Sequence, residues 1–89
     1  MDISKEEVKT KIKRFIRSTF LLNNPTCEFA DEDSFMEKGI IDSTGVLEVI
    51  NFLQTDFGIE VLDSEVLPEN IDSVSNIASY VSRKTGIPV

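Results

Sequence analysis

The feature that most constrains the fold is the spacing of apolar residues, which recur three and four positions apart in several stretches of this 89-residue chain. This is the period of a helix with one buried face. It predicts helices over about 5–21, from 43 to about 57, around 64–67, and from 72 or 73 to before 86. Pro68 is expected to end the short third helix. The sequence therefore predicts one all-α domain over residues 1–89, a small four-helix bundle with a long loop between its first two helices.

Each of the longer helices carries an apolar face for the core. In the first helix these residues are Val8, Ile12, Phe15, Ile16 and Thr19. In the second helix they are Val46, Val49, Ile50, Leu53 and Phe57, with Leu47 and Phe52 at the borders of the face. In the last helix they are Val74, Ile77, Ala78 and Val81. The long loop holds Phe29, Phe35 and Met36, which are expected to pack it against the core.

Sequence signals for helix ends support this division. Ser4 and Glu7 form a capping box at the first helix, with Ile3 and Val8 as a hydrophobic staple. Gly58 fits the residue that ends the second helix in a left-handed conformation.

The start of the second helix is the most informative short segment, Gly39-Ile40-Ile41-Asp42-Ser43-Thr44. Asp42 is expected to cap the free amide groups of the first turn, with Ile41 and Val46 as a staple, so that the helix begins at Ser43. The Ser43 hydroxyl then lies at a helix N-terminus, where unpaired amide groups and the helix dipole favour a phosphate group. Gly45 weakens the helix and predicts local mobility beside Ser43.

The dipeptide Asp-Ser is not distinctive by itself, since it also occurs at 33–34, 63–64 and 72–73. Capping or turn formation is the usual explanation of such pairs. Only the pair at 42–43 follows a glycine and two isoleucines and opens the longest apolar-periodic stretch in the second half of the chain. Ser43 is therefore the candidate site for chemistry.

The composition excludes several kinds of active site. The chain has no histidine and one cysteine, so Ser-His-Asp catalysis, Cys-His catalysis and a cysteine/histidine zinc site are excluded within it. Cys27 cannot form an internal disulfide and is expected to be a packing or loop residue in a reducing compartment. The first residues lack the apolar segment of a signal peptide, and no run approaches the ~20 apolar residues of a membrane span. A monomeric, soluble, cytoplasmic protein without membrane insertion is expected.

The charges are unevenly distributed around a net charge of −7. Six of the nine basic residues lie in the first helix, and no lysine or arginine occurs between Gly39 and Ser82. The acidic segment would repel nucleic acid and attract a basic patch on a protein partner. The alternative is a solvated acidic surface that only aids solubility. The basic charges are spread around the first helix and are expected mainly to solvate it.

These features together resemble the acyl and peptidyl carrier proteins, in which a serine opening the second of four helices carries 4′-phosphopantetheine. The resemblance covers nearly all of the chain. Its strongest element is the segment from Gly39 to Ser43, which matches the family pattern Gly-x-x-Asp-Ser. The family usually has leucine and then an acidic residue after the serine, where this chain has Thr44 and Gly45. It is more similar to small stand-alone carriers that serve a dedicated ligase or a specialised synthase.

The resemblance implies a carrier and not an enzyme. A phosphopantetheinyl transferase would use coenzyme A and Mg²⁺ to place the arm on Ser43, beside the capping residue Asp42. The thiol of the arm would hold an acyl or aminoacyl group as a thioester for fatty-acid, polyketide or nonribosomal peptide synthesis. A ligase, synthase or acyltransferase with a basic patch would dock on the residues Thr44, Leu47, Glu48, Asp63 and Glu65. A long acyl chain is expected to shelter among Val46, Ile50, Phe52 and Leu67.

Two other functions remain open from the sequence. The first is an unmodified acidic helical adaptor that binds a basic protein and uses Ser43 only to begin a helix. The second is a metal site at the acidic loop residues Glu28, Asp31, Glu32 and Asp33. That loop lacks the alternating ligands, central glycine and final glutamate of an EF-hand, so no metal is expected there.

Overall fold

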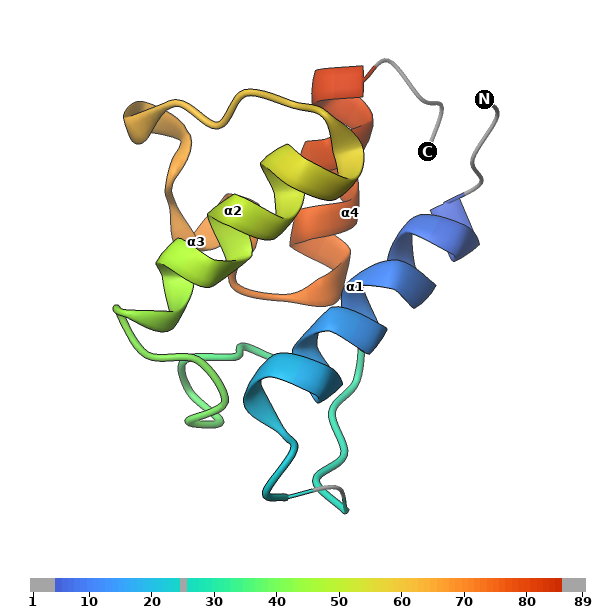
Figure 1. Ribbon diagram of the computed structural model, residues 1–89, viewed down its shortest axis with the longest axis vertical. Coiled ribbons are helices and arrows are strands. Elements are labelled where there is room, and N and C mark those ends of the chain that lie inside the picture. Colours follow the sequence, from blue (N-terminus) through green and yellow to red (C-terminus); the bar gives the residue numbers. More distant parts are fainter. Residues whose placement is uncertain (1–4, 25, 86–89) are drawn as a thin grey trace.

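The computed structural model describes residues 5–24 and 26–85. They form the helices α1 (Lys5–Phe20), α2 (Gly45–Phe57), α3 (Pro68–Ile71) and α4 (Val74–Thr85), with a 3₁₀ turn, η1 (Asp63–Glu65), between α2 and α3 (Figure 1). These residues contain no β-strand, which confirms the all-helical expectation. The molecule measures 34 × 26 × 21 Å. None of the described helices is long and apolar enough to cross a membrane.

The core forms around α4, which packs against the three other helices. All four residues predicted to face inward from α4 are buried, namely Val74, Ile77, Ala78 and Val81. On α1 the predicted residues Val8, Ile12 and Ile16 are buried, but Thr19 is exposed. The apolar face of α1 ends instead with the half-buried Phe20 and the buried Leu21. The predicted cap and staple residues Ser4 and Ile3 lie outside the described residues.

The face that α2 buries is rotated from the predicted one. Val49 and Leu53 are buried as predicted, but Phe52 is also buried while Ile50 is only half-buried. The cause is an aromatic pair, because the ring of Phe52 stacks on that of Phe15 in α1, with 4.1 Å between centroids and 7° between planes. Phe52 therefore joins α2 to α1 and does not lie at a border.

The third helix differs most from the prediction. A helix was expected around 64–67 with Pro68 ending it, whereas the residues 63–65 form only the turn η1 and Pro68 begins α3. Proline is favoured in the first turn of a helix because the amide hydrogen that it lacks would have no partner there. The carbonyl of Leu67 accepts hydrogen bonds from the amides of Asn70 and Ile71, and Ile71 is buried.

The long loop between α1 and α2 is fastened to the junction of α3 and α4. Phe35 is fully buried, and its amide donates a 2.8 Å hydrogen bond to the carbonyl of Asp72. The Asp72 carboxylate accepts hydrogen bonds from the Ser34 hydroxyl and, at 3.0 Å, from the Met36 amide. The carbonyl of Phe35 then accepts the amide of Ile40 at 2.8 Å. This loop lies at the lower end of Figure 1, and its anchoring fixes the path of the chain into α2.

Candidate functional site

Ser43 lies in a capped first turn just before the regular part of α2. The Asp42 carboxylate accepts a 2.7 Å hydrogen bond from the Gly45 amide, and its carbonyl accepts one of 3.2 Å from the Val46 amide. Asp42 therefore caps the helix as predicted. The regular helix starts at Gly45, two residues later than predicted, but Thr44 already has helical angles of φ −73° and ψ −39°.

The Ser43 side chain is exposed, and its hydroxyl forms no hydrogen bond with the part of the chain that the structure describes. In two of the three other Asp-Ser pairs, the serine hydroxyl is already engaged in a hydrogen bond. The Ser34 hydroxyl is bonded to Asp72, and the buried Ser73 caps α4 by accepting a 3.0 Å hydrogen bond from the Asn76 amide. Ser64 is exposed, like Ser43, but lies in the short turn η1. Ser43 thus combines an accessible hydroxyl with the N-terminus of a 13-residue helix.

Gly45 has a packing role that the sequence did not reveal. It is buried, and a Cβ atom placed on it would lie 2.8 Å from Cε1 of Phe20 and 3.0 Å from Cγ2 of Ile41. A side chain at this position would force Phe20 and Ile41 to shift, so the glycine lets the end of α1 and the loop approach α2 closely. The glycine therefore packs tightly beside Ser43, a role that its low helix propensity did not indicate. The sequence signal for this close packing was a glycine in the first turns of a predicted helix.

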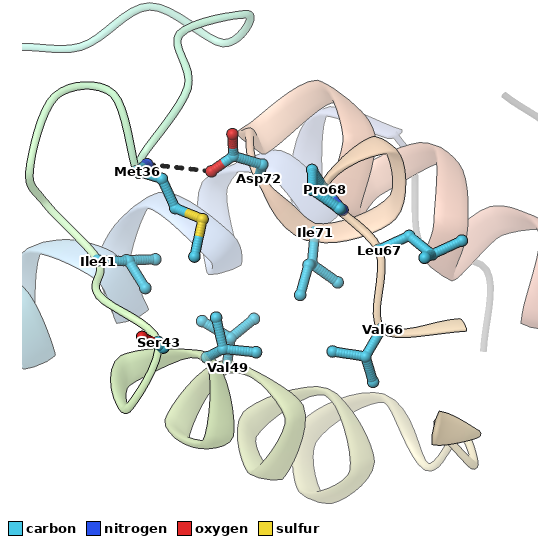
Figure 2. A pocket seen from close by; sticks show the side chains of 10 residues that line it. Met36, Ile41, Ser43, Val49, Val66, Leu67, Pro68, Ile71 and Asp72 are labelled. Atoms are coloured by element: carbon cyan, nitrogen blue, oxygen red, sulfur yellow. Dashed lines mark hydrogen bonds between the residues drawn. The ribbon is translucent and has the colours of Figure 1, made fainter. Parts of the chain in front are cut away.

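An apolar cavity of about 220 Å³ opens beside Ser43 (Figure 2). Its wall comes from the loop, from the first turns of α2 and from α3 with the residues before it. The apolar lining includes Met36, Ile41, Val46, Val49, Val66 and Ile71. Figure 2 shows Ser43 at the edge of this cavity, with Met36, Val49 and Ile71 directed into it and Asp72 at its far rim. A chain attached to Ser43 has an apolar space directly next to its point of attachment.

The cavity differs from the predicted shelter for an acyl chain. Val46 and Leu67 line it as expected, but Ile50 and Phe52 do not. The ring of Phe52 is instead stacked on Phe15, on the side of α2 that faces α1. The rotation of α2 therefore turns Val49 toward the cavity.

The predicted docking residues fall into two groups. Thr44, Leu47 and Glu48 are all exposed and share one side of α2 because they are three and four residues apart. Leu47 is 66% exposed and gives this side of α2 an apolar surface. Asp63 is exposed on η1. The fifth residue, Glu65, is half-buried and turns toward α4.

Glu65 connects the segment before α3 to α4. Its Oε1 atom accepts hydrogen bonds from Lys84 Nζ at 2.9 Å, from the Tyr80 hydroxyl at 3.0 Å and from the Leu62 amide at 3.2 Å. The Lys84 ammonium, the Leu62 amide and the Tyr80 hydroxyl together lower the pKa of Glu65. Burial, with the Glu65 carboxylate beside it, raises the pKa of Tyr80 to about 12. Because Val66 follows Glu65 directly, this cluster also holds one wall of the cavity.

We expect these contacts of Glu65 to make stability depend on pH. The pKa of Glu65 in the folded state lies below its ordinary value of 4.5, so the ionised form stabilises the fold. This contribution is complete above pH 4.5 and is lost as the pH falls through the lowered pKa. In urea unfolding, Glu65→Gln should therefore be less stable than the parent at pH 7, and the difference should shrink in acid. The exposed Glu60→Gln serves as the control, and a difference independent of pH would contradict the assignment.

The acidic loop uses its carboxylates to fasten itself to nearby lysines. Asp31 pairs with Lys9 at 3.0 Å and with Lys13 at 2.8 Å, and these two lysines lower its pKa. Asp33 pairs with Lys38 at 3.4 Å. Within residues 5–24 and 26–85, no group of three or more histidine, cysteine or acidic residues is placed to hold a metal ion.

Comparison with known proteins gives two similar sequences. The chain is 31% identical over 84 residues to an acyl carrier protein of Lactobacillus acidophilus, a match that covers 94% of this chain and 100% of that protein. It is 29% identical over 85 residues to an acyl carrier protein of Acidothermus cellulolyticus, covering 96% of each. No protein-family model matches the chain. Both matches extend over nearly the whole fold, including the loop and the start of α2.

Proposed function

This chain belongs to the acyl carrier protein family, and from that premise we propose that it carries an acyl intermediate on a 4′-phosphopantetheine arm attached to Ser43. The observation that carries the proposal is the exposed Ser43 hydroxyl, free of hydrogen bonds to the described residues, at a capped helix start beside an apolar cavity. The whole chain, residues 1–89, acts as one carrier domain. Its role is to hold and present the intermediate, while partner enzymes perform the chemistry.

The residues around Ser43 fit the attachment of a phosphate diester. The hydroxyl oxygen would form the new bond to the phosphorus next to pantetheine, and the pyrophosphate bond of coenzyme A would break. Adenosine 3′,5′-bisphosphate would leave, and the hydroxyl proton would pass to a base of the transferase. The N-terminus of α2 favours the remaining negative charge by about 0.3–1 kcal/mol. The Asp42 carboxylate already accepts a hydrogen bond from the Gly45 amide. A separate phosphopantetheinyl transferase, with Mg²⁺, supplies the catalysis.

The cavity indicates the chemical class of the cargo. Its lining is almost entirely apolar, and at about 220 Å³ it exceeds the ~150 Å³ that holds a benzene molecule in an engineered protein cavity. Each methylene group moved from water into it contributes about 0.8 kcal/mol. An aliphatic acyl chain therefore fits this space better than a charged aminoacyl group.

We expect the length of the acyl chain to change the stability of the loaded protein. An eight-carbon acyl group on the arm should raise the thermal unfolding midpoint above that of the acetyl form, because only the longer chain reaches and fills the cavity. The amide signals of Val49 and Ile71 should shift between the two forms. Equal midpoints with unshifted signals would show that the cargo stays outside the cavity.

Partner enzymes are proposed to dock on the exposed side of α2 next to Ser43. Thr44, Leu47 and Glu48 provide an apolar contact and a negative charge, and Asp63 adds a second negative charge. A basic patch on the transferase, ligase, synthase or acyltransferase would complement these charges. Glu65 contributes through the position of the 62–68 segment, since its carboxylate is bound to Lys84 and Tyr80.

The proposed function also implies a cellular compartment for the protein. Coenzyme A, the donor of the arm, is a cytoplasmic metabolite, and the unpaired Cys27 thiol suits a reducing compartment. We propose a cytoplasmic monomer.

The experiment that tests this function is the intact mass of the purified protein after incubation with coenzyme A, Mg²⁺ and a broad-specificity phosphopantetheinyl transferase. We expect a mass increase equal to one phosphopantetheine group. A folded protein without an adduct would reject the carrier function and leave the unmodified acidic adaptor as the better explanation.

A further inference from the structure

The basic residues that the structure describes differ in whether their charge is already paired. Ion pairs with carboxylates are formed by Lys9, Lys13, Lys38 and Lys84. Arg83 donates a 2.7 Å hydrogen bond to the Asn70 amide oxygen. Lys11, Arg14 and Arg17 form no ion pair with any residue in 5–24 or 26–85. These three cations therefore lie together on one helix of a chain whose net charge is −7.

These three cations surround one open depression between α1 and α2, which we call the α1 groove. Its lining includes Lys11, Arg14, Phe15, Arg17, Leu22 and Phe52. The stacked rings of Phe15 and Phe52 supply aromatic surface in the groove. Leu22 is 72% exposed and adds apolar surface. The groove thus combines an apolar surface with a positive rim, and it is distinct from the cavity beside Ser43.

Two of the cations are held in place by contacts that leave their charges unpaired. The Lys11 ammonium lies 5.6 Å from the centre of the Phe57 ring. The Arg17 guanidinium donates a 3.1 Å hydrogen bond to the Cys27 carbonyl and lies 5.1 Å from the centre of the Phe29 ring. Such contacts restrain a cation near an aromatic face without neutralising it. The side chains of these two cations would therefore lose less conformational entropy when a ligand binds to them.

We propose that the α1 groove binds an acidic segment of a partner protein. Its carboxylates would contact Lys11, Arg14 and Arg17, and an apolar side chain between them would pack on the pair formed by Phe15 and Phe52. The charges and the apolar surface of the groove are complementary to such a segment. This second surface would let a partner hold the protein by α1 while α2 and Ser43 stay accessible.

The acidic residues of the protein disfavour two other anionic partners for the α1 groove, a membrane and a second copy of this chain. An extended anionic membrane would also meet Asp56, which lies in the groove, and the acidic side of α2. A second copy of this chain would bring its own charge of −7 against the first. A narrow peptide segment can lie along α1 away from the acidic side of α2, and in the groove it meets three cations against the single carboxylate of Asp56.

The test is a nuclear magnetic resonance titration of the ¹⁵N-labelled protein with a capped synthetic peptide of repeated Glu-Leu-Glu units. We expect saturable shifts at the amides of Arg14, Phe15, Ser18 and Phe52, and none at Glu48. Arg14→Glu should weaken binding about tenfold, whereas Arg83→Glu, the same charge change at an exposed arginine of α4, should alter it by less than about twofold. Circular dichroism would verify that both variants are folded.

Several outcomes would overturn the proposal. Equal binding of a matched Gln-Leu-Gln peptide would remove the charge argument, and equal effects of the two arginine variants would show general attraction in place of a site. Shifts with phosphatidylglycerol vesicles but none with the peptide would make a membrane the occupant. The titration is repeated with Ser43→Ala, which should bind the peptide equally well, so the result stands apart from the carrier function.

Discussion

Ser43→Ala is expected to abolish attachment of phosphopantetheine completely, because the substitution removes the only atom that forms the bond to phosphorus. The fold should be retained, since the Ser43 side chain is exposed and its hydroxyl bonds to no described residue. Asp42 would still cap the helix through the Gly45 amide. The intact mass after incubation with coenzyme A, Mg²⁺ and transferase measures the result.

Ser64→Ala is the matched control for this variant. Ser64 also follows an aspartate and is exposed, but it lies in the turn η1, away from a long helix. It should acquire the same adduct as the parent protein. If Ser43→Ala retained the adduct while Ser64→Ala lost it, the modification would belong to the other Asp-Ser pair.

Phe35→Ala is expected to cause the largest loss of stability, about 3–5 kcal/mol in the free energy of unfolding. Phe35 is fully buried, it contacts the ring of Phe29 edge to face at 5.8 Å, and its backbone joins the loop to Asp72. Since a typical domain has only about 5–15 kcal/mol of stability in total, much of this small fold would be unfolded. Urea denaturation followed by helical circular dichroism gives the value.

The variant Phe29→Ala serves as the comparison, because it removes an aromatic ring from the same loop without removing Phe35. Phe29 is only half-buried, so its truncation should cost clearly less than that of Phe35. Phe35→Ala should also slow the modification of Ser43, because the segment before α2 loses its attachment. A loss below about 1 kcal/mol for Phe35→Ala would show that the loop is not needed for the fold.

The predictable parts of this fold are those set by local physical rules. The buried face of α4 follows from its helical spacing, and Gly58 ends α2 with φ 65° as its lack of a side chain permits. The cap by Asp42 needs only neighbouring residues. The candidate site at Ser43 depends on the same short segment, and for this reason the sequence alone could propose it.

The features that sequence reasoning missed depend on residues distant in the chain. Phe52 is buried because Phe15 lies against it, and Gly45 is needed because Phe20 comes close. Glu65 faces inward because α4 brings Tyr80 to it. Propensity rules contain no such pairs, so they placed Phe52 at a border and treated Gly45 as a weakness.

The attachment of the loop to Asp72 has a consequence for when the protein becomes a substrate during its synthesis. Residues 34–36 find their partner 36–38 positions further along the chain, so the loop before Ser43 has no anchor until the start of α4 has left the ribosome. Contacts over such separations form late because a long segment must first be closed. A nascent chain that stops before Asp72 would expose Ser43 without its native surroundings. If Ser43 carries the arm as proposed, we expect its modification to wait until nearly the whole chain has been made.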